Sequence, residues 1–305
     1  MKKLNYCYAV LAQKLSNFAE NLAVPLLYQK KGDISSITDL RYDKSKNSVC
    51  DFYYIDNKEK RPVLIYIHGG GFISGVKRLR KYYCYEYAKQ GFFVMNTHYD
   101  YAPQKKFPHQ IHQLFKAVEF LFNNAEKYKL DLSRIVLGGE SAGGYFCCYL
   151  AAVAKDKSLY EKFGIEFQYK DTFDVKACVL LNGAYDYTRL AKNKFFNMGT
   201  FLYSFFGMTR KELLSKEKQD KCSYFSPLSF INKDFPPSVV VEASKDLLGE
   251  ESRELVKLLN SLGIRNIHLI AKGIVGIHGF CLAVKTKEGN RILAETMNFI
   301  KQAIL

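Results

Sequence analysis

Residues 134–144 read Arg-Ile-Val-Leu-Gly-Gly-Glu-Ser-Ala-Gly-Gly, and this stretch decides how the whole chain is interpreted. An apolar run of strand length, Arg134–Leu137, leads through a short turn into a helix-length segment that opens at Ala142. Ser141 stands at the turn, where the free N–H groups and the positive dipole end of the helix face its side-chain oxygen. A strand, a sharp turn and a helix present a serine hydroxyl as a nucleophile, so we predict that role for Ser141.

Two glycines, Gly139 and Gly143, complete a G-x-S-x-G motif around the serine. A turn this sharp strains the backbone of the serine and leaves room only for small neighbours, which these residues and Gly144 provide. The motif alone is a weak signal, and its other interpretation is a glycine-rich turn that caps a helix. The strand before it and the helix after it favour the nucleophile.

A second glycine-rich motif, His68-Gly69-Gly70-Gly71-Phe72, directly follows the apolar run Val63–Ile67. Consecutive glycines let a backbone pass close to a ligand and expose its N–H groups. Two such donors and the N–H of Ala142 would form an oxyanion hole for a tetrahedral intermediate. A phosphate-binding loop is the alternative, but no Lys-Ser or Lys-Thr pair follows the glycines and no helix opens immediately after them.

A serine nucleophile needs a base, and two histidines, His268 and His278, follow Ser141 in the chain. His268 alternates with apolar residues in a strand-like pattern, which predicts a structural role. His278 follows a glycine-containing loop beyond that strand, where an imidazole is reachable. We therefore predict that His278 is the base.

The carboxylate that orients the base should follow a strand and precede the histidine. Asp246 lies on the loop between the predicted strand Ser238–Glu242 and the predicted helix Glu250–Leu262, and its alternative role is a helix N-cap. Glu250 and Glu251 begin that helix, where acids favour the dipole. We predict that Asp246 is the orienting acid, which gives the chain order serine, aspartate, histidine found in α/β-hydrolases.

Strand-length apolar runs alternate with helix-length amphipathic segments from residue 62 onward, which predicts a parallel sheet covered by helices on both faces. The expected strands are Val63–Ile67, Phe92–Thr97, Arg134–Leu137, Val175–Leu181, Ser238–Glu242 and Ile267–Ile270, and the expected helices are Leu79–Gln90, Gln110–Tyr128, Ala142–Ala154, Glu250–Leu262 and Asn290–Ala303.

Three further segments complete the predicted organisation. Ile37–Tyr42 and Val49–Ile55 are expected to form a hairpin. The aromatic-rich stretch Tyr185–Phe235 interrupts the alternation, and a connection of this length predicts a lid above the carboxyl edge of the sheet. The first 30 residues or so carry apolar side chains at helical spacing and are interrupted by polar ones, which favours an amphipathic helix over a signal peptide.

The composition of the 305 residues is that of a globular protein, with 48% hydrophobic and 25% charged residues. The net charge of +15 is spread along the chain, so we expect a solvated surface and no nucleic-acid partner, while an acidic partner stays an alternative. No apolar run reaches the roughly 18 residues of a membrane span, and no membrane insertion is expected. The eight cysteines lack metal-site or disulfide-framework spacing, which indicates a reducing, cytoplasmic compartment.

The chain resembles the hormone-sensitive-lipase-like branch of the α/β-hydrolases from about Arg61 to the C-terminus. The motifs that carry the resemblance are His68–Phe72, Tyr99 with Ala102-Pro103, Phe107-Pro108, Gly139–Gly144, Ser226-Pro227-Leu228, Asp246 with Glu251, and His278-Gly279-Phe280. This chain departs from the usual pattern at Asp100-Tyr101, at Gln113 and at Leu247-Leu248, positions that concern packing and cap contacts more than the catalytic residues.

The resemblance implies one α/β-hydrolase domain over residues 1–305, with an eight-stranded, mostly parallel sheet and helices on both faces. It implies a helical cap built from residues 1–32 and the 185–235 insertion. It places the oxyanion hole at the amides of Gly70, Gly71 and Ala142. The motif residues that would support the site are His68, Gly69, Gly139 and Gly143.

The function that these residues predict is a serine carboxylesterase for short- to medium-chain acyl esters, with Ser141, Asp246 and His278 as the triad. No cofactor and no metal are implied, and the partner is a small-molecule ester, bound by a monomer or a homodimer. The alternatives are an arylformamidase-type amide hydrolase and a sugar acetyl or feruloyl esterase. A non-catalytic small-molecule-binding homologue is a further alternative, which the presence of His278 disfavours.

Overall fold

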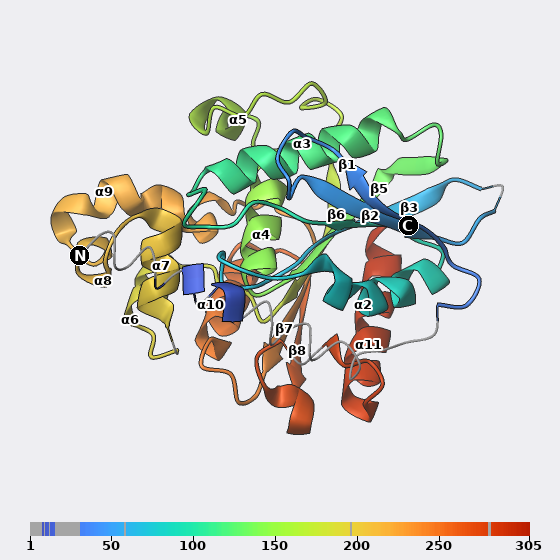
Figure 1. Cartoon of the computed structure of the whole chain (residues 1–305). Helices are drawn as coiled ribbons and strands as arrows, with labels where there is room; N and C mark the ends of the chain where they lie inside the picture. Colours follow the sequence, from blue (N-terminus) through green and yellow to red (C-terminus); the bar gives the residue numbers. More distant parts are fainter. Residues whose placement is uncertain are drawn as a thin grey trace.

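Eight strands form one twisted sheet in the order β1-β2-β4-β3-β5-β6-β7-β8 (Figure 1). β2 runs antiparallel to β1 and to β4, and every other neighbouring pair is parallel. The strands are β1 (Ser35–Arg41), β2 (Val49–Tyr54), β3 (Arg61–Ile67), β4 (Phe93–Thr97), β5 (Leu130–Glu140), β6 (Val175–Leu181), β7 (Ser238–Ala243) and β8 (Asn266–Ala271). The predicted eight-stranded, mostly parallel sheet and its N-terminal hairpin are confirmed.

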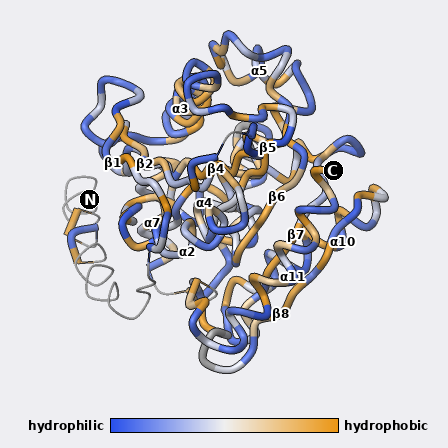
Figure 2. Tube along the Cα trace, turned by 90° about the vertical axis from the view of Figure 1, so that its right-hand side faces the viewer, coloured by the Kyte–Doolittle hydropathy of each residue, from blue (hydrophilic) through white to orange (hydrophobic). Residues whose placement is uncertain are grey.

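Helices cover both faces of this sheet, as predicted. They are α2 (Lys77–Lys89), α3 (His109–Asn123), α4 (Ala142–Lys155), α5 (Ser158–Lys162), α10 (Gly249–Ser261) and α11 (Lys287–Ala303). Helices α2 and α11 pack on one face and α3, α4 and α10 on the other. The molecule therefore has three layers, and Figure 2 shows apolar residues concentrated along the strands between them.

The central strand β3 shows how the sequence builds the core. Val63, Ile65 and Ile67 point to the face covered by α3 and α4, while Leu64 and Tyr66 point to the face covered by α2 and α11. Successive side chains of a strand alternate between its two faces, so a strand covered on both must be apolar throughout. The continuous apolar run that predicted this strand is explained by its double burial.

The predicted boundaries that differ most from the structure are those of α3 and β5, and one tertiary contact explains the first. The helix expected over Gln110–Tyr128 ends at Asn123, because the chain then turns to enter β5. The Tyr128 carbonyl accepts a 2.7 Å hydrogen bond from Nη1 of the buried Arg61, which fixes this turn from a distant part of the chain. The strand expected over Arg134–Leu137 extends to residues 130–140, because its first residues pair with the start of β3 and its glycine-containing end pairs with both β3 and β6.

The predicted insertion, residues 185–235, forms a cluster of short helices beyond one end of the sheet (Figure 1). It contains α6 (Tyr187–Lys192), α7 (Met198–Phe206), α8 (Arg210–Leu213), α9 (Gln219–Cys222) and the 3-10 helices η1 (Lys216–Lys218), η2 (Ser223–Phe225) and η3 (Pro227–Phe230). Its start is anchored by Glu251 of α10, whose carboxylate accepts the backbone N–H groups of Tyr185 and Asp186 at 2.7 Å and pairs with Arg189. Burial raises the pKa of Glu251, and these donors oppose that effect.

The computed structural model describes residues 31–57, 59–195, 197–279 and 282–305, with residues 8, 10, 11 and 13–15 nearer the N-terminus. The predicted N-terminal helix therefore lies largely outside the described residues. Within those ranges, no helix combines the length and the apolar character that crossing a membrane requires. The six cysteines that the structure describes are buried free thiols.

Arg61 allows a test of the turn that ends α3. Its guanidinium donates to the carbonyl oxygens of Ile55, Asn57 and Tyr128. Replacing Arg61 by Ala leaves the buried Tyr128 carbonyl without this donor and should lower the free energy of unfolding by roughly 1–3 kcal/mol. The matched control is Arg134→Ala, which removes a half-exposed ion pair and should cost less than about 1 kcal/mol in urea denaturation. Equal losses in the two variants would contradict the role of Arg61.

Candidate active site

Ser141 occupies the turn between β5 and α4, as the motif predicted. Its backbone angles are φ 54° and ψ −118°, a strained conformation for a residue other than glycine. Gly139 and Gly143 flank the serine because a side chain at either position would not fit, and not because their backbone angles favour glycine. A Cβ at Gly143 would lie 1.9 Å from the Ile67 carbonyl oxygen, and one at Gly139 would lie 2.6 Å from the same atom. The turn is thus pressed against the carboxyl end of β3.

The structure brings the predicted base and acid to the serine. His278 lies just beyond η4 (Gly273–Gly276), and its Nε2 is 2.9 Å from Ser141 Oγ. Its Nδ1 is 2.6 Å from Oδ2 of Asp246, on the loop between β7 and α10. A carboxylate only accepts, so Nδ1 carries a proton, and in the neutral imidazole Nε2 then presents a lone pair to the serine hydroxyl.

Backbone hydrogen bonds hold Asp246 and His278 in place beside each other. The Leu248 N–H donates to Asp246 Oδ1 at 2.9 Å, and the carboxylate is 1% exposed. The Lys245 N–H donates to the Gly276 carbonyl at 2.8 Å, which joins the loop of the acid to the loop of the histidine. The Asp–His contact therefore rests on a link between two loops and not on the side chains alone.

The glycine loop after β3 lies beside the serine. Gly70 and Gly71 have φ values of 131° and 60°, which favour glycine, and Phe72 has 68°. Within the described part of the chain, the N–H groups of Gly70 and Gly71 donate to no other residue. The N–H of Ala142, at the first position of α4, has no partner within its helix. All three residues line the same cavity as Ser141.

Glu140, the residue before the serine, fixes the glycine loop from behind. Its buried carboxylate accepts the Gly69 N–H at 2.6 Å and the Tyr66 hydroxyl at 2.7 Å. It also pairs with Arg80 of α2 at 2.6 Å, which compensates the burial of the charge. Sequence reasoning missed Arg80, because no local pattern links residues 60 positions apart.

His68 is the side chain around which the glycine loop winds. Its Nδ1 lies 2.7 Å from the Gly69 carbonyl oxygen and its Nε2 lies 2.7 Å from Nδ1 of His98. The Tyr99 ring stacks on it at 4.5 Å, and the Tyr99 hydroxyl donates to the His68 carbonyl. Burial lowers the pKa of His68 well below its ordinary value, and burial together with Lys77 lowers the pKa of His98 to about 4. Both imidazoles are therefore neutral at neutral pH.

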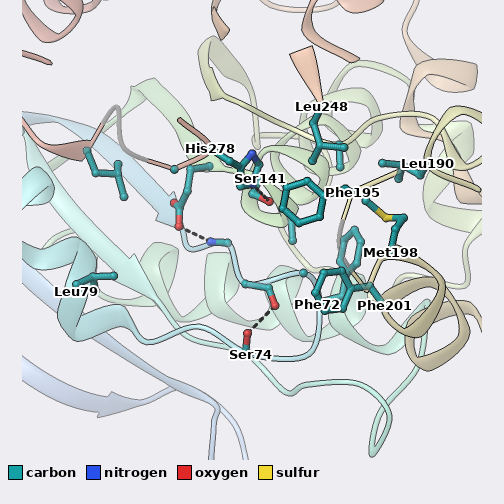
Figure 3. Close-up of a pocket in the computed structure, with 18 of the residues that line it drawn as sticks. Phe72, Ser74, Leu79, Ser141, Leu190, Phe195, Met198, Phe201, Leu248 and His278 are labelled. Carbon is teal, nitrogen blue, oxygen red and sulfur yellow. Dashed lines mark hydrogen bonds between the residues drawn. The ribbon is translucent and has the colours of Figure 1, made fainter. Parts of the chain in front are cut away.

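A cavity of about 330 Å³ opens above the serine (Figure 3). One side is apolar and comes from the insertion and the loop before α10, with Leu190, Phe195, Met198, Phe201 and Leu248. The Phe195 ring stands edge-on to the His278 ring with centroids 5.3 Å apart, and the Phe201 ring lies against Gly71. Ser141 and the glycine loop thus border a partly open, largely apolar pocket.

Comparison with known proteins now adds to this geometry. The model of the BD-FAE family matches residues 50–259, which is more than half of the chain. The chain belongs to the BD-FAE family. The resemblance to hormone-sensitive-lipase-like α/β-hydrolases that the motifs indicated is confirmed.

Several relatives place this BD-FAE protein among esterases. It is similar to an esterase of Gibberella moniliformis, 23% identical over 75% of this chain and 70% of the relative. It is also similar to an acetyl esterase of Salmonella dublin, 26% identical over 68% of this chain and 62% of the relative. Esterase B from Lactobacillus rhamnosis has the same fold, with a TM-score of 0.82 at 21% identity over 97% and 96% of the two chains. These relatives support a carboxylic ester hydrolase.

The second downstream histidine of this BD-FAE protein is not at the site. His268 lies on β8 with its Nε2 3.1 Å from Oε2 of Glu242. Glu242 lies within β7, at the end of the predicted strand Ser238–Glu242, and it also pairs with Arg253. The sequence-based choice between the two histidines therefore agrees with where the structure places them.

The buried His68–His98 pair predicts a pH dependence of stability in this BD-FAE protein. Both pKa values are lowered on folding, so the unfolded chain binds more protons between about pH 6.5 and pH 4. Stability should therefore fall as the pH decreases through that window. His98→Asn keeps a donor but cannot titrate, and its stability should decline less steeply, by up to about 1.4 kcal/mol per pH unit. Urea denaturation between pH 7 and pH 4.5 measures the difference, and parallel curves would contradict it.

Proposed function

We propose that this protein is a serine carboxylesterase in which Ser141, His278 and Asp246 form the catalytic triad. The observation that carries the proposal is the imidazole of His278, which hydrogen-bonds Ser141 Oγ at 2.9 Å and Asp246 Oδ2 at 2.6 Å. The unused N–H groups of Gly70, Gly71 and Ala142 supply the oxyanion hole on the cavity side of the serine. The relatives named as esterases support the same reaction class.

The first half of the reaction forms an acyl-enzyme. Ser141 Oγ attacks the ester carbonyl carbon while His278 Nε2 takes the hydroxyl proton. The carbonyl oxygen becomes an oxyanion held by the three backbone N–H groups, and Asp246 stabilises the imidazolium through the Nδ1–H bond. The tetrahedral intermediate then collapses, the bond to the alcohol oxygen breaks, and the imidazolium returns its proton to the leaving alcohol.

The second half of the reaction regenerates the serine. A water molecule attacks the acyl carbon while His278 Nε2 takes one of its protons, and the second oxyanion occupies the same hole. Collapse breaks the bond to Ser141 Oγ, which receives the proton from His278. The acid is released, and the free enzyme is restored with no net change in the protein.

The shape of the cavity supports short to medium acyl chains as the substrates. Its volume of about 330 Å³ lies near the lower end of small-molecule sites, which run from roughly 300 to 1,000 Å³. The apolar side chains beside the serine suit an acyl chain more than a sugar, which needs many hydrogen-bond partners. The similarity to an acetyl esterase supports the shorter end of this range.

The insertion at residues 185–235 acts as the cap in this proposal. Four of its side chains line the cavity, and they come from α6, the following loop and α7: Leu190, Phe195, Met198 and Phe201. The other proposed part of the cap, residues 1–32, falls mostly on residues that the structure does not describe. The cap thus supplies the wall of the substrate site, and the sheet supplies the chemistry.

The two downstream histidines give a matched test of the triad. Ser141→Ala and His278→Ala should lower kcat on p-nitrophenyl acetate and butyrate by about 10⁴-fold or more, because the nucleophile or its base is lost. His268→Ala, which removes a histidine 24% exposed on β8, should retain activity. Initial rates of nitrophenol release measure all three variants.

A fluorophosphonate probe tests the nucleophile independently of turnover. It should label wild type at Ser141, as located by peptide mass spectrometry, and should not label Ser141→Ala. Labelling at another serine, or equal nitrophenol release by wild type and Ser141→Ala, would overturn the proposed function. Turnover of N-formylkynurenine far above that of any ester would replace it with an amide hydrolase of the same mechanism.

A substitution at Met198 tests where the acyl chain of the substrate lies in the cavity. The Met198 side chain is buried and closes the apolar side of the cavity (Figure 3). Met198→Ala should lengthen that space and raise the octanoate-to-acetate ratio of kcat/KM by on the order of 10-fold. Met208→Ala is the control, because that side chain contacts Cys222 in the same insertion and does not line the cavity. A ratio that changes equally in both variants would contradict this placement.

A further inference from the structure

We propose that Ser74 and His98 are positioning residues that orient the two backbone donors of the oxyanion hole by holding the carbonyl oxygens of the same peptide units. The inference rests on the proposed function, since it assigns a role within that oxyanion hole. Neither residue belongs to the motifs from which the site was predicted.

The geometry of the peptide bond links these carbonyls to the donors. The N–H of Gly70 belongs to the peptide unit whose carbonyl is that of Gly69, and the N–H of Gly71 shares a unit with the carbonyl of Gly70. A trans peptide is planar, so its N–H and C=O point in opposite directions. Fixing each carbonyl behind the loop therefore fixes the direction of the N–H that faces the cavity.

Ser74 holds the second of these peptide units. Its hydroxyl donates to the Gly70 carbonyl oxygen at 2.8 Å, and the backbone N–H groups of Ile73 and Ser74 donate to the same oxygen at 3.2 and 3.0 Å (Figure 3). Ser74 is 1% exposed. The carbonyl thus receives three donors from one side, and a glycine with φ of 131° is held in a conformation that it could otherwise leave.

His98 holds the first peptide unit through His68. The Gly69 carbonyl only accepts, so the contact from His68 Nδ1 at 2.7 Å requires a proton on that nitrogen. A neutral His68 then has a lone pair at Nε2, which accepts the Nδ1–H of His98 at 2.7 Å. His98 therefore selects the His68 tautomer that donates to the loop.

The packing around His68 and the Gly69 carbonyl is consistent with a role for His98 in orienting the peptide unit. A Cβ at Gly75 would lie 2.1 Å from the Gly69 carbonyl oxygen, so the loop closes tightly around His68. Among the described residues that line the cavity, His98 is absent, so it acts on the reaction through His68 and not by touching substrate. Donors on a carbonyl also polarise the peptide, which strengthens its N–H as a donor to the developing oxyanion.

Steady-state kinetics of two truncations test the inference. Ser74→Ala and His98→Phe should lower kcat on p-nitrophenyl butyrate by on the order of 10-fold, which is less than the 10²–10³ for losing a donor outright. KM should stay within about twofold, because the donors act on the transition state more than on the bound ester. A trifluoromethyl ketone, which forms a reversible oxyanion adduct with the serine, should lose affinity by the same factor as kcat.

A rescue variant separates positioning from general structural damage. His98→Asn restores an N–H donor near the position of Nδ1 and should recover most of the kcat that His98→Phe loses. Equal losses in His98→Asn and His98→Phe would overturn the role of His98. Unchanged kcat in Ser74→Ala, or a rise in KM alone, would overturn the role of Ser74.

The same measurements distinguish failure of this inference from failure of the proposed function. If wild type hydrolyses the ester and Ser141→Ala does not, the esterase assignment stands whatever Ser74→Ala shows. If wild type and Ser141→Ala are equally inactive, the esterase and the positioning roles are both overturned. Ser74→Ala removes one oxygen atom and leaves the backbone contacts of the loop in place, so it supplies a folded variant for the decisive comparison.

Discussion

The close contact between the turn at Ser141 and the end of β3 is the constraint on which the rest of the site depends. A Cβ at Gly143 would lie 1.9 Å from the Ile67 carbonyl oxygen, so this approach exists only because no side chain intervenes. β3 runs directly from Ile67 into the glycine loop, while β5 runs into the serine. One backbone-to-backbone contact therefore sets the distance between Ser141 and the glycine loop, and no side chain lies between the two segments at that point.

Charge and hydrogen bonding then lock the loop at that spacing. Glu140 is the last residue of β5, and its carboxylate accepts the Gly69 N–H, so the strand that leads into Ser141 also holds the glycine loop. Burial of a carboxylate without partners would cost free energy, and the ion pair with Arg80 offsets that cost. Arg80 belongs to α2, which covers the face of the sheet opposite to α4. The candidate site thus draws on both helical layers, although Ser141 itself lies at the carboxyl end of the central strand β5.

The features that could be predicted from the sequence are those encoded within a short stretch of neighbouring residues. The turn at Ser141 was predictable because its chemistry, a strand, small neighbours and a helix start, is written within eleven residues. Arg80 and His98 were not, because each acts on the glycine loop from a separate element and neither leaves a local pattern. Helix α3 was predicted too long for the same reason, since a distant arginine sets its end. Glu251 was placed correctly in the first turn of α10, but its buried contacts with the insertion follow from tertiary packing.

The sheet and the insertion supply different parts of the proposed site. The sheet carries the proposed catalytic residues, and the insertion supplies the apolar wall that would select the substrate. The proposed catalytic groups are held by backbone contacts and by buried polar groups, which tolerate little change without leaving a donor or acceptor unpaired. The apolar wall is built from α6, α7 and their connecting loop, and the start of this segment is held by Glu251 and Ser226 rather than by the residues that face the cavity. Side chains such as Met198 can therefore differ in size without disturbing the anchor. Substrate range can then vary through the wall, while the geometry around Ser141 stays constrained by the end of β3.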